Sequence, residues 1–141
     1  MDTKQLTPNL SVAGQITKDD IADIAAQGFK VIINNRPDDE GKDQPTANSI
    51  KTIAKQYGIT YIYQPVTGTA ITNENAADFR KHIEANKGPI LAQCRTGTRC
   101  TILWMLSQAK DHDANELLAT ATKAGYSLEQ VRERLENLFN S

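Results

Sequence analysis

The sequence is short of the features that mark secreted and membrane proteins. It has only two cysteines in 141 residues, too few for a disulfide framework. Its longest uninterrupted apolar run, residues 102–106, is far below the roughly 20 residues that a membrane-spanning helix needs. Residues 1–5 contain no basic segment leading into an apolar one, so no secretory signal is visible. We therefore expect a cytoplasmic protein with free thiols and no membrane partner.

The chain also lacks an excess of either charge. Sixteen basic and seventeen acidic residues give a formal charge of −1, which removes the electrostatic reason to expect a nucleic-acid partner. His82 and His112 form no metal-ligand pattern with the cysteines, so we expect no metal and no cofactor. Hydrophobic residues make up 39% of the chain, an ordinary globular share. The length predicts one domain, residues 1–141.

Strand and helix patterns alternate along the chain. Strands are predicted at 9–13, 30–34, 59–66 and 89–93, and helices at 17–28, 47–57, 72–87, 101–109, 114–121 and 127–138. This alternation predicts an α/β fold of three layers, with a mainly parallel sheet flanked by helices. Such folds place their sites at the carboxyl ends of strands, where the polar segments 34–41 and 94–99 stand here.

The segment between the last strand and the helix that follows it carries the chemistry. It consists of Cys94, Arg95, Thr96, Gly97, Thr98 and Arg99, and we call it the cysteine loop. A loop at this place turns backbone N–H groups into one concavity and adds the positive end of a helix dipole. Gly97 permits the turn, and Arg99 supplies a forked cation for an oxyanion. Cys94 would then have a lowered pKa and act as a nucleophile.

The cysteine loop resembles two known signatures. Its C-x4-R spacing resembles the active loop of single-domain rhodaneses, whereas cysteine phosphatases have C-x5-R and the sixth residue after Cys94 is Cys100. Segments 10–15, 31–38 with Glu40, 63–66 and 88–104 resemble the bacterial beta-lactamase-hydrolase-like, phosphatase-like domain family. That resemblance implies a protein-tyrosine-phosphatase-like fold. It leaves the activity open, because the family carries a phosphatase label while related modules occur beside sulfur-oxidising enzymes.

Two observations favour sulfur chemistry over phosphorus chemistry. Resemblance to the two superfamilies implies that the shorter loop suits a sulfur group on cysteine. Phosphatases also need an acid to protonate the leaving alkoxide, and resemblance places that acid in segment 64–72, which has neither a carboxylate nor a histidine. Sulfite leaves thiosulfate without such a proton. Asp38, Asp39 and Glu40 are the nearest substitutes, although a solvated acidic loop explains them as well.

Two further residues bear on the site. Arg36 follows a strand end and is a candidate for binding a dianionic substrate, or else a structural partner of Glu40. Cys100 is a candidate second thiol, either a sulfur acceptor or a resolving thiol, or else a buried apolar residue. It is expected to be a poor hydrogen-bond donor to Cys94, so Thr98 or Thr101 would take that part. Arg95 is expected to point outward.

The sequence therefore predicts a rhodanese-type sulfurtransferase that forms a persulfide on Cys94. Its partners would be a small anionic sulfur donor and a thiol acceptor. The first alternative is a cysteine-dependent phosphatase that acts on a phosphate ester through a phosphocysteine intermediate. The second is a non-catalytic module that binds anions and presents a surface to another protein, which would not need a lowered cysteine pKa.

Overall fold

The computed structural model describes all 141 residues and contains one five-stranded sheet surrounded by helices. Its strands are β1 (Thr3–Thr7), β2 (Leu10–Ala13), β3 (Val31–Asn34), β4 (Thr60–Tyr63) and β5 (Ile90–Gln93). Its helices are α1 (Ile21–Ala26), α2 (Ala47–Gln56), α3 (Asn73–Ala85), α4 (Thr98–Gln108), α5 (Ala114–Lys123) and α6 (Arg132–Phe139), and short 3-10 turns η1 (Lys18–Asp20) and η2 (Glu129–Val131) precede α1 and α6.

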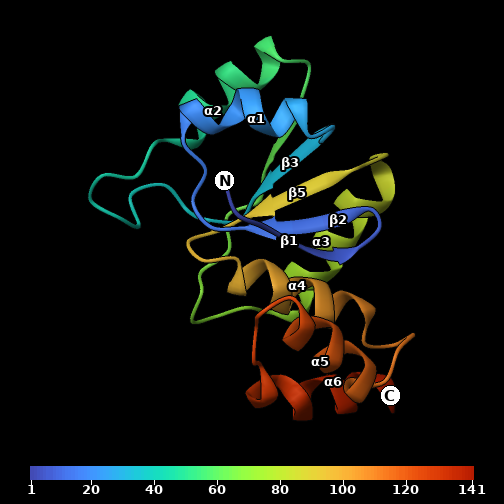
Figure 1. Cartoon of the computed structure of the whole chain (residues 1–141). Coiled ribbons are helices and arrows are strands. Elements are labelled where there is room, and N and C mark those ends of the chain that lie inside the picture. The colour runs from blue at the N-terminus through green and yellow to red at the C-terminus, as the bar shows by residue number, and fades with distance from the viewer.

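The predicted three-layer α/β arrangement is confirmed. The strand order is β1-β2-β5-β3-β4, and every pair is parallel except β1 with β2. Helices α1 and α2 cover one face of the sheet, and α3 to α6 cover the other (Figure 1). None of the helices has the length and apolar character that crossing a membrane would require.

The central strand β5 supports both hydrophobic cores. Alternate side chains of a strand point to opposite faces, so Leu91 enters a ten-residue cluster under α1 and α2. Ile90 and Ala92 enter the 24-residue cluster under α3 to α6. All four β5 residues are buried, and removing the Leu91 side chain to Ala would cost about 2–5 kcal/mol. The start of the cysteine loop is therefore held from both sides.

The structure differs from the predicted elements at three places. Strand β1 was not expected, because its sequence TKQLT is polar and it pairs only at the sheet edge. Strand β4 ends at Tyr63, short of the predicted residue 66. The predicted start of the last helix at residue 127 is wrong, since the 3-10 turn η2 comes first and α6 begins at Arg132.

The carboxyl ends of the parallel strands meet at one edge of the sheet. The backbone continues this contact past the strands, since the Asn35 amide donates to the Gln93 carbonyl at 2.8 Å and the Val66 amide donates to the Asn35 carbonyl at 3.0 Å. As a result, the segments that follow β3, β4 and β5 leave the sheet on the same side (Figure 1).

Candidate active site

Cys94 lies at the base of the cysteine loop with its sulfur enclosed by backbone amides. It directly follows β5 and is 1% exposed. The Gly97 amide donates to Cys94 Sγ at 3.0 Å, and the amides of Thr96 and Cys100 also act on the sulfur. Gly97 has φ 92°, a left-handed conformation that favours glycine, and α4 begins at the next residue. The sulfur thus faces the positive end of α4.

These donors lower the pKa of Cys94 to about 5. The largest cause is the Cys100 side chain, a neutral thiol next to the Cys94 sulfur, and the amides of Cys100, Thr96 and Gly97 add to it. Burial acts in the opposite direction, because it penalises the charged form. At neutral pH the Cys94 side chain is therefore a thiolate, which is the nucleophilic form of cysteine.

The Cys100 thiol, expected to be a poor donor to Cys94, has one proton and donates it to Asn35 Oδ1 at 3.1 Å. Cys100 is fully buried in the first turn of α4, where burial and the neighbouring thiolate raise its pKa, so it stays a neutral thiol beside the Cys94 sulfur. The threonines proposed for this part are engaged elsewhere. Thr101 Oγ1 donates to the Gly97 carbonyl at 2.8 Å, and Thr98 Oγ1 accepts a hydrogen bond from Thr96 Oγ1 at 3.1 Å.

Arg99 reaches from α4 to the segments that follow β3 and β4. Its Nη1 donates to the Val66 carbonyl at 3.0 Å and to the Asn35 carbonyl at 3.4 Å. Nη1 and Nη2 bind the Glu40 carboxylate at 3.1 and 3.0 Å. Arg99 Nε is buried and has no hydrogen-bond partner. One edge of the guanidinium is therefore fixed by the protein, and Nε is left as a free donor.

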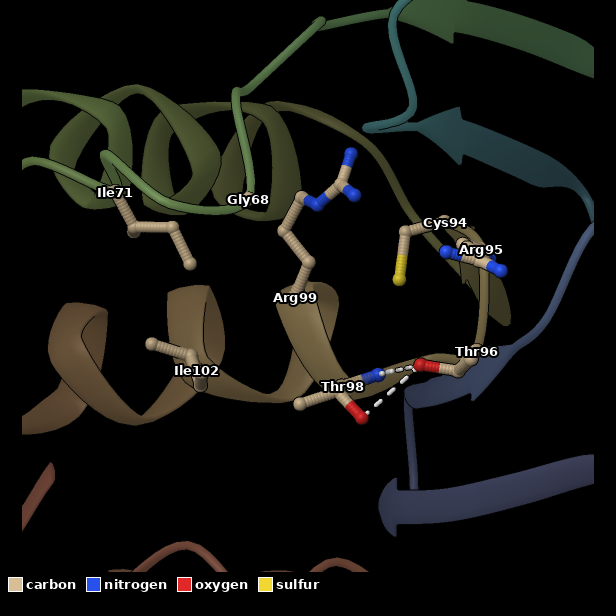
Figure 2. A pocket seen from close by; sticks show the side chains of 8 residues that line it. All are labelled: Gly68, Ile71, Cys94, Arg95, Thr96, Thr98, Arg99 and Ile102. Atoms are coloured by element: carbon tan, nitrogen blue, oxygen red, sulfur yellow. Dashed lines mark hydrogen bonds between the residues drawn. The ribbon is translucent and has the colours of Figure 1, made fainter. Parts of the chain in front are cut away.

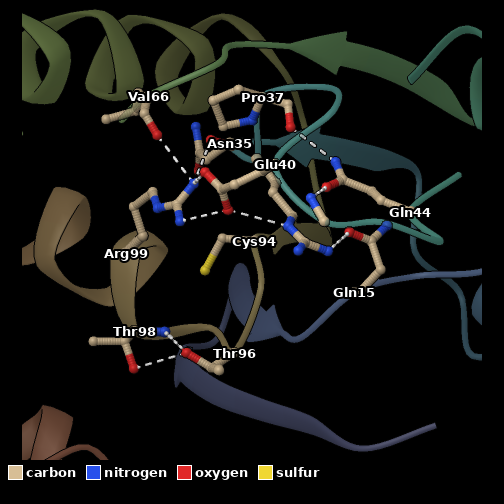
Figure 3. Close-up of polar contacts among 12 residues, drawn as sticks. Gln15, Asn35, Pro37, Glu40, Gln44, Val66, Cys94, Thr96, Thr98 and Arg99 are labelled. Atoms are coloured by element: carbon tan, nitrogen blue, oxygen red, sulfur yellow. Dashed lines mark hydrogen bonds and ion pairs between the residues drawn. The ribbon is translucent and has the colours of Figure 1, made fainter. Parts of the chain in front are cut away.

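Glu40 joins the two arginines of the site. Figure 3 shows the Glu40 carboxylate against the Arg99 guanidinium. Glu40 Oε1 also accepts a hydrogen bond from Arg36 Nε at 3.1 Å, and Arg36 Nη1 donates to Gln15 Oε1 at 2.9 Å. The Arg36 and Arg99 side chains are only 10% and 11% exposed. The hydrogen bond from Arg99, followed by the one from Arg36, lowers the pKa of Glu40 despite burial. Glu40 is thus an ionised bridge, and the sequence-based pairing of Arg36 with Glu40 is present.

A cavity of about 390 Å³ opens above Cys94. It is lined by Gly68, Ile71, Cys94, Arg95, Thr96, Thr98, Arg99 and Ile102. Figure 2 shows Ile71 and Ile102 at one end and the cysteine loop at the other. Arg95 is exposed, as expected from the sequence. No carboxylate and no histidine is among these residues, and no cluster in the structure has three or more side chains suited to a metal ion.

The acidic residues proposed as substitutes for a general acid do not line this cavity. Asp38 Oδ1 accepts a hydrogen bond from the Ala47 amide at 2.8 Å, at the start of α2. The backbone amide of Asp38 donates to the Tyr63 hydroxyl at 2.8 Å. Asp39 is exposed and has φ 65°. Asp38 therefore serves the local fold, and neither aspartate is positioned to donate a proton at Cys94.

Two residues that the sequence did not single out belong to the site. Asn35 accepts a hydrogen bond from the Cys100 thiol at 3.1 Å, and its Nδ2 donates to the Gln64 carbonyl at 2.9 Å. The sequence signal that could have identified Asn35 is the pair Asn34-Asn35, two polar residues at the carboxyl end of the buried strand β3. Tyr126 donates to the Thr96 carbonyl at 3.0 Å. Tyr126 lies 30 residues after Thr96 in the chain, so no local sequence pattern could predict this contact.

Comparison with known protein families finds one match over most of the chain. Residues 2–111 match the model of the beta-lactamase hydrolase-like protein, phosphatase-like domain. Beta-lactamase hydrolase-like proteins of Agrobacterium fabrum and Xylella fastidiosa (strain Temecula1) are 37% and 33% identical over 111 residues, which is 79% of this chain. That stretch is 26% of each relative, so the chain spans about a quarter of the length of these curated proteins.

Solved structures give the same picture of the fold. A candidate phosphatase of Neisseria meningitidis Z2491 is 41% identical with a TM-score of 0.88, and the match covers 96% of each chain. The active form of Tk-PTP is 14% identical with a TM-score of 0.73, and 98% of this chain matches 96% of that one. The catalytic core of a PP-IP phosphatase from S. cerevisiae is 13% identical, with a TM-score of 0.70 over 98% of this chain and 83% of that one. The fold is therefore of the protein-tyrosine-phosphatase type.

Proposed function

The chain belongs to the beta-lactamase hydrolase-like, phosphatase-like domain family, and from that membership and the geometry of Cys94 we propose that it is a cysteine-dependent phosphatase. The substrate would be a phosphate monoester, and the intermediate a phosphocysteine on Cys94. The observation that carries this proposal is the Cys94 sulfur itself. It accepts a hydrogen bond from the Gly97 amide at 3.0 Å at the base of a cavity lined by Arg95 and Arg99.

In the first step the Cys94 thiolate attacks the phosphorus atom. An S–P bond forms, the ester P–O bond breaks, and the alcohol oxygen leaves with the electron pair. The loop amides and Arg99 Nε are the donors available to the phosphoryl oxygens, which carry the negative charge of the transition state. In the second step water attacks the phosphorus, the S–P bond breaks, inorganic phosphate leaves and the thiolate is restored.

The leaving group decides how fast the first step runs. No carboxylate or histidine lines the cavity, and Glu40 is held ionised by two arginines. An alkoxide would therefore leave without a positioned proton donor, whereas a phenoxide is stable enough to leave with little help. Ile71 and Ile102 give the far end of the cavity an apolar wall. We accordingly propose aryl phosphates as better substrates than alkyl phosphates.

Sulfur transfer is the second candidate, and the same cavity favours it. The cysteine loop has four residues between Cys94 and Arg99, and sulfur transfer needs no general acid. The thiolate would attack the outer sulfur of thiosulfate, forming an S–S bond to Cys94 and breaking the donor S–S bond, so that sulfite leaves with the electron pair. A thiol acceptor would then take the sulfur. Cys100 is fully buried, which makes it a poor acceptor site for an external sulfur group.

A non-catalytic anion-binding module is the least supported candidate. Such a module has no use for a thiolate, yet three amides and the Cys100 thiol lower the pKa of Cys94 to about 5. A thiol pKa lowered by surrounding donors at a helix N-terminus is typical of nucleophilic cysteines. We therefore favour an enzyme over a binding module, with phosphate ester hydrolysis as the first candidate activity and sulfur transfer as the second.

One experiment separates the two reactions. The protein is mixed in parallel with an aryl phosphate, an alkyl phosphate, thiosulfate and a persulfide donor, then quenched in acid and weighed intact. The phosphatase proposal expects a gain of one phosphoryl group with the aryl phosphate, together with release of inorganic phosphate. Cys94→Ser should abolish the gain, and the matched Cys100→Ser should retain it, since Cys100 is fully buried and is not the attacking thiolate. A gain of one sulfur with no phosphoryl adduct would reverse the order of the candidates.

A further inference from the structure

The peptide group between Thr96 and Gly97 is hydrogen-bonded at both ends. Its N–H donates to Cys94 Sγ at 3.0 Å, and its carbonyl accepts a hydrogen bond from the Tyr126 hydroxyl at 3.0 Å. A peptide group is planar, so its N–H and C=O point in opposite directions along fixed lines. Whatever holds the carbonyl therefore also sets the direction of the N–H that faces the sulfur.

Tyr126 reaches this carbonyl because of the way α5 ends. The Gly125 amide donates to the Thr122 carbonyl at 2.9 Å, and the Tyr126 amide donates to the Ala121 carbonyl at 2.9 Å. Gly125 has φ 104°. This pair of bonds with a left-handed glycine is the Schellman motif, which reverses the chain at a helix end. The reversal brings the residue after Gly125 back toward the cysteine loop.

The tyrosine ring also fits closely against the loop. A Cβ placed on Gly97 would overlap the Tyr126 hydroxyl and would lie 3.0 Å from its Cζ. The ring is partly buried and packs against the larger hydrophobic cluster, which fixes where the hydroxyl can go. Gly97 is thus needed for its backbone angle and for the room that it leaves to Tyr126.

We propose that Tyr126 is a positioning residue, which holds the Thr96 carbonyl and thereby aims the Gly97 amide at the Cys94 sulfur. A hydrogen bond to a carbonyl also polarises the amide, so the N–H on its other side becomes a stronger donor. Burial, followed by the charge on Cys94, raises the pKa of Tyr126, which keeps the hydroxyl protonated as the donor that this role requires. The family match ends at residue 111, before this residue.

The inference deepens the proposed function, since it rests on Cys94 acting as a thiolate. Without the Tyr126 hydroxyl, the Thr96–Gly97 peptide can rotate at little cost, because Gly97 has no Cβ to restrict it. The thiolate then loses part of one charge-assisted hydrogen bond. Thiols react as thiolates, so the consequence is visible in the pH dependence of Cys94 alkylation.

The test is the variant Tyr126→Phe, which keeps the ring and removes the hydroxyl. Its rate of alkylation by iodoacetamide is measured against pH, with Cys94→Ser giving the background from Cys100. We expect the midpoint of the rate profile to rise by roughly 0.5–1 pH unit, with the plateau at high pH preserved. Tyr57→Phe is the matched control, because Tyr57 is 50% exposed and its hydroxyl makes no hydrogen bond, and its midpoint should equal that of the wild type.

A Tyr126→Phe protein that titrates at the wild-type midpoint overturns the proposal. The assay needs no turnover, so a raised midpoint supports the role of Tyr126 even in a protein that hydrolyses no phosphate ester. Where aryl phosphate is hydrolysed, the acid limb of kcat/KM should move by the same amount as the alkylation midpoint.

Discussion

The charge on Cys94 links the stability of the fold to pH. The pKa of Cys94 is about 5 in the folded protein, against roughly 8.5 for an unfolded cysteine. Between these values the unfolded chain binds a proton that the folded chain does not bind, so the free energy of unfolding rises with pH. The slope for one such group is at most ~1.4 kcal/mol per pH unit. Over this window the gain is on the order of 5 kcal/mol as an upper limit.

The sign of this effect follows from the direction of the pKa shift. Because the folded pKa is lowered, the stabilisation is complete above a pH of about 8.5 and is lost as the pH falls through about 5. Cys100 acts in the opposite sense, since its raised pKa makes the folded state hold a proton that the unfolded chain loses at high pH. The free energy of unfolding is therefore expected to rise with pH between the folded and the unfolded pKa of Cys94.

Urea unfolding of the wild type and of Cys94→Ser, both under reducing conditions, measures this effect. Serine does not titrate, and every other titrating group is common to the two proteins, so the difference between their unfolding free energies isolates Cys94. We expect the unfolding free energy of the wild type, relative to that of the variant, to increase steadily from about pH 5 to about pH 8.5. Two stability curves that run parallel across this range would refute a stabilised thiolate.

Three substitutions test the surroundings of the sulfur. Arg99→Lys keeps the charge but loses the fork, so kcat/KM on an aryl phosphate should fall at least about tenfold, or roughly 1.4 kcal/mol; full activity would mean that Arg99 does not hold the substrate. Gly97→Ala should raise the pH midpoint of Cys94 alkylation, because its Cβ overlaps the Tyr126 hydroxyl and φ is 92°; a midpoint equal to that of the wild type would show that the loop tolerates the Cβ without loss of its hydrogen bond to the sulfur. Glu40→Gln should lower the free energy of unfolding at pH 7 by about 1–3 kcal/mol in urea titrations, since Arg36 and Arg99 lose their shared counter-ion. The lowered pKa of Glu40 means that this difference should vanish as the pH falls through that pKa, and a difference that persists in acid would argue against an ionic bridge.

Local sequence patterns predicted most of the fold because its elements obey local rules. Buried strands such as β3 and β5 are continuous apolar runs, and Thr72 accepts a hydrogen bond from the Asn75 amide at the start of α3, as a cap should. Strand β1 was not predicted because its sequence, TKQLT, is polar and has no apolar pattern typical of a strand. It is a strand only because it pairs with β2 at the edge of the sheet. The helix expected to start at residue 127 starts later, because residues 129–131 form a 3-10 turn before α6.

The candidate site was predictable where neighbours in sequence are neighbours in space. Cys94, Thr96 and Arg99 lie on one strand-loop-helix unit, so their convergence on one pocket follows from local rules. The influence of Cys100 on the pKa of Cys94 was missed because a general ranking of donors says nothing about a neutral thiol buried directly beside a thiolate. The contacts of Glu40 and Tyr126 with the site span 59 and 30 residues of chain, and only the folded structure brings these residues together.

The C-terminal helices have a practical consequence for where this protein can be cut. The match to the family model ends at residue 111, and an expression fragment trimmed to that limit would look like a complete unit. Yet Leu117, Leu118 and Leu135, which belong to the larger hydrophobic cluster, lie beyond that limit and are at most 4% exposed. Such a fragment would expose the apolar face of α4 and remove the Schellman turn that carries Tyr126. The segment that the family model matches is thus shorter than the chain that forms the larger hydrophobic cluster.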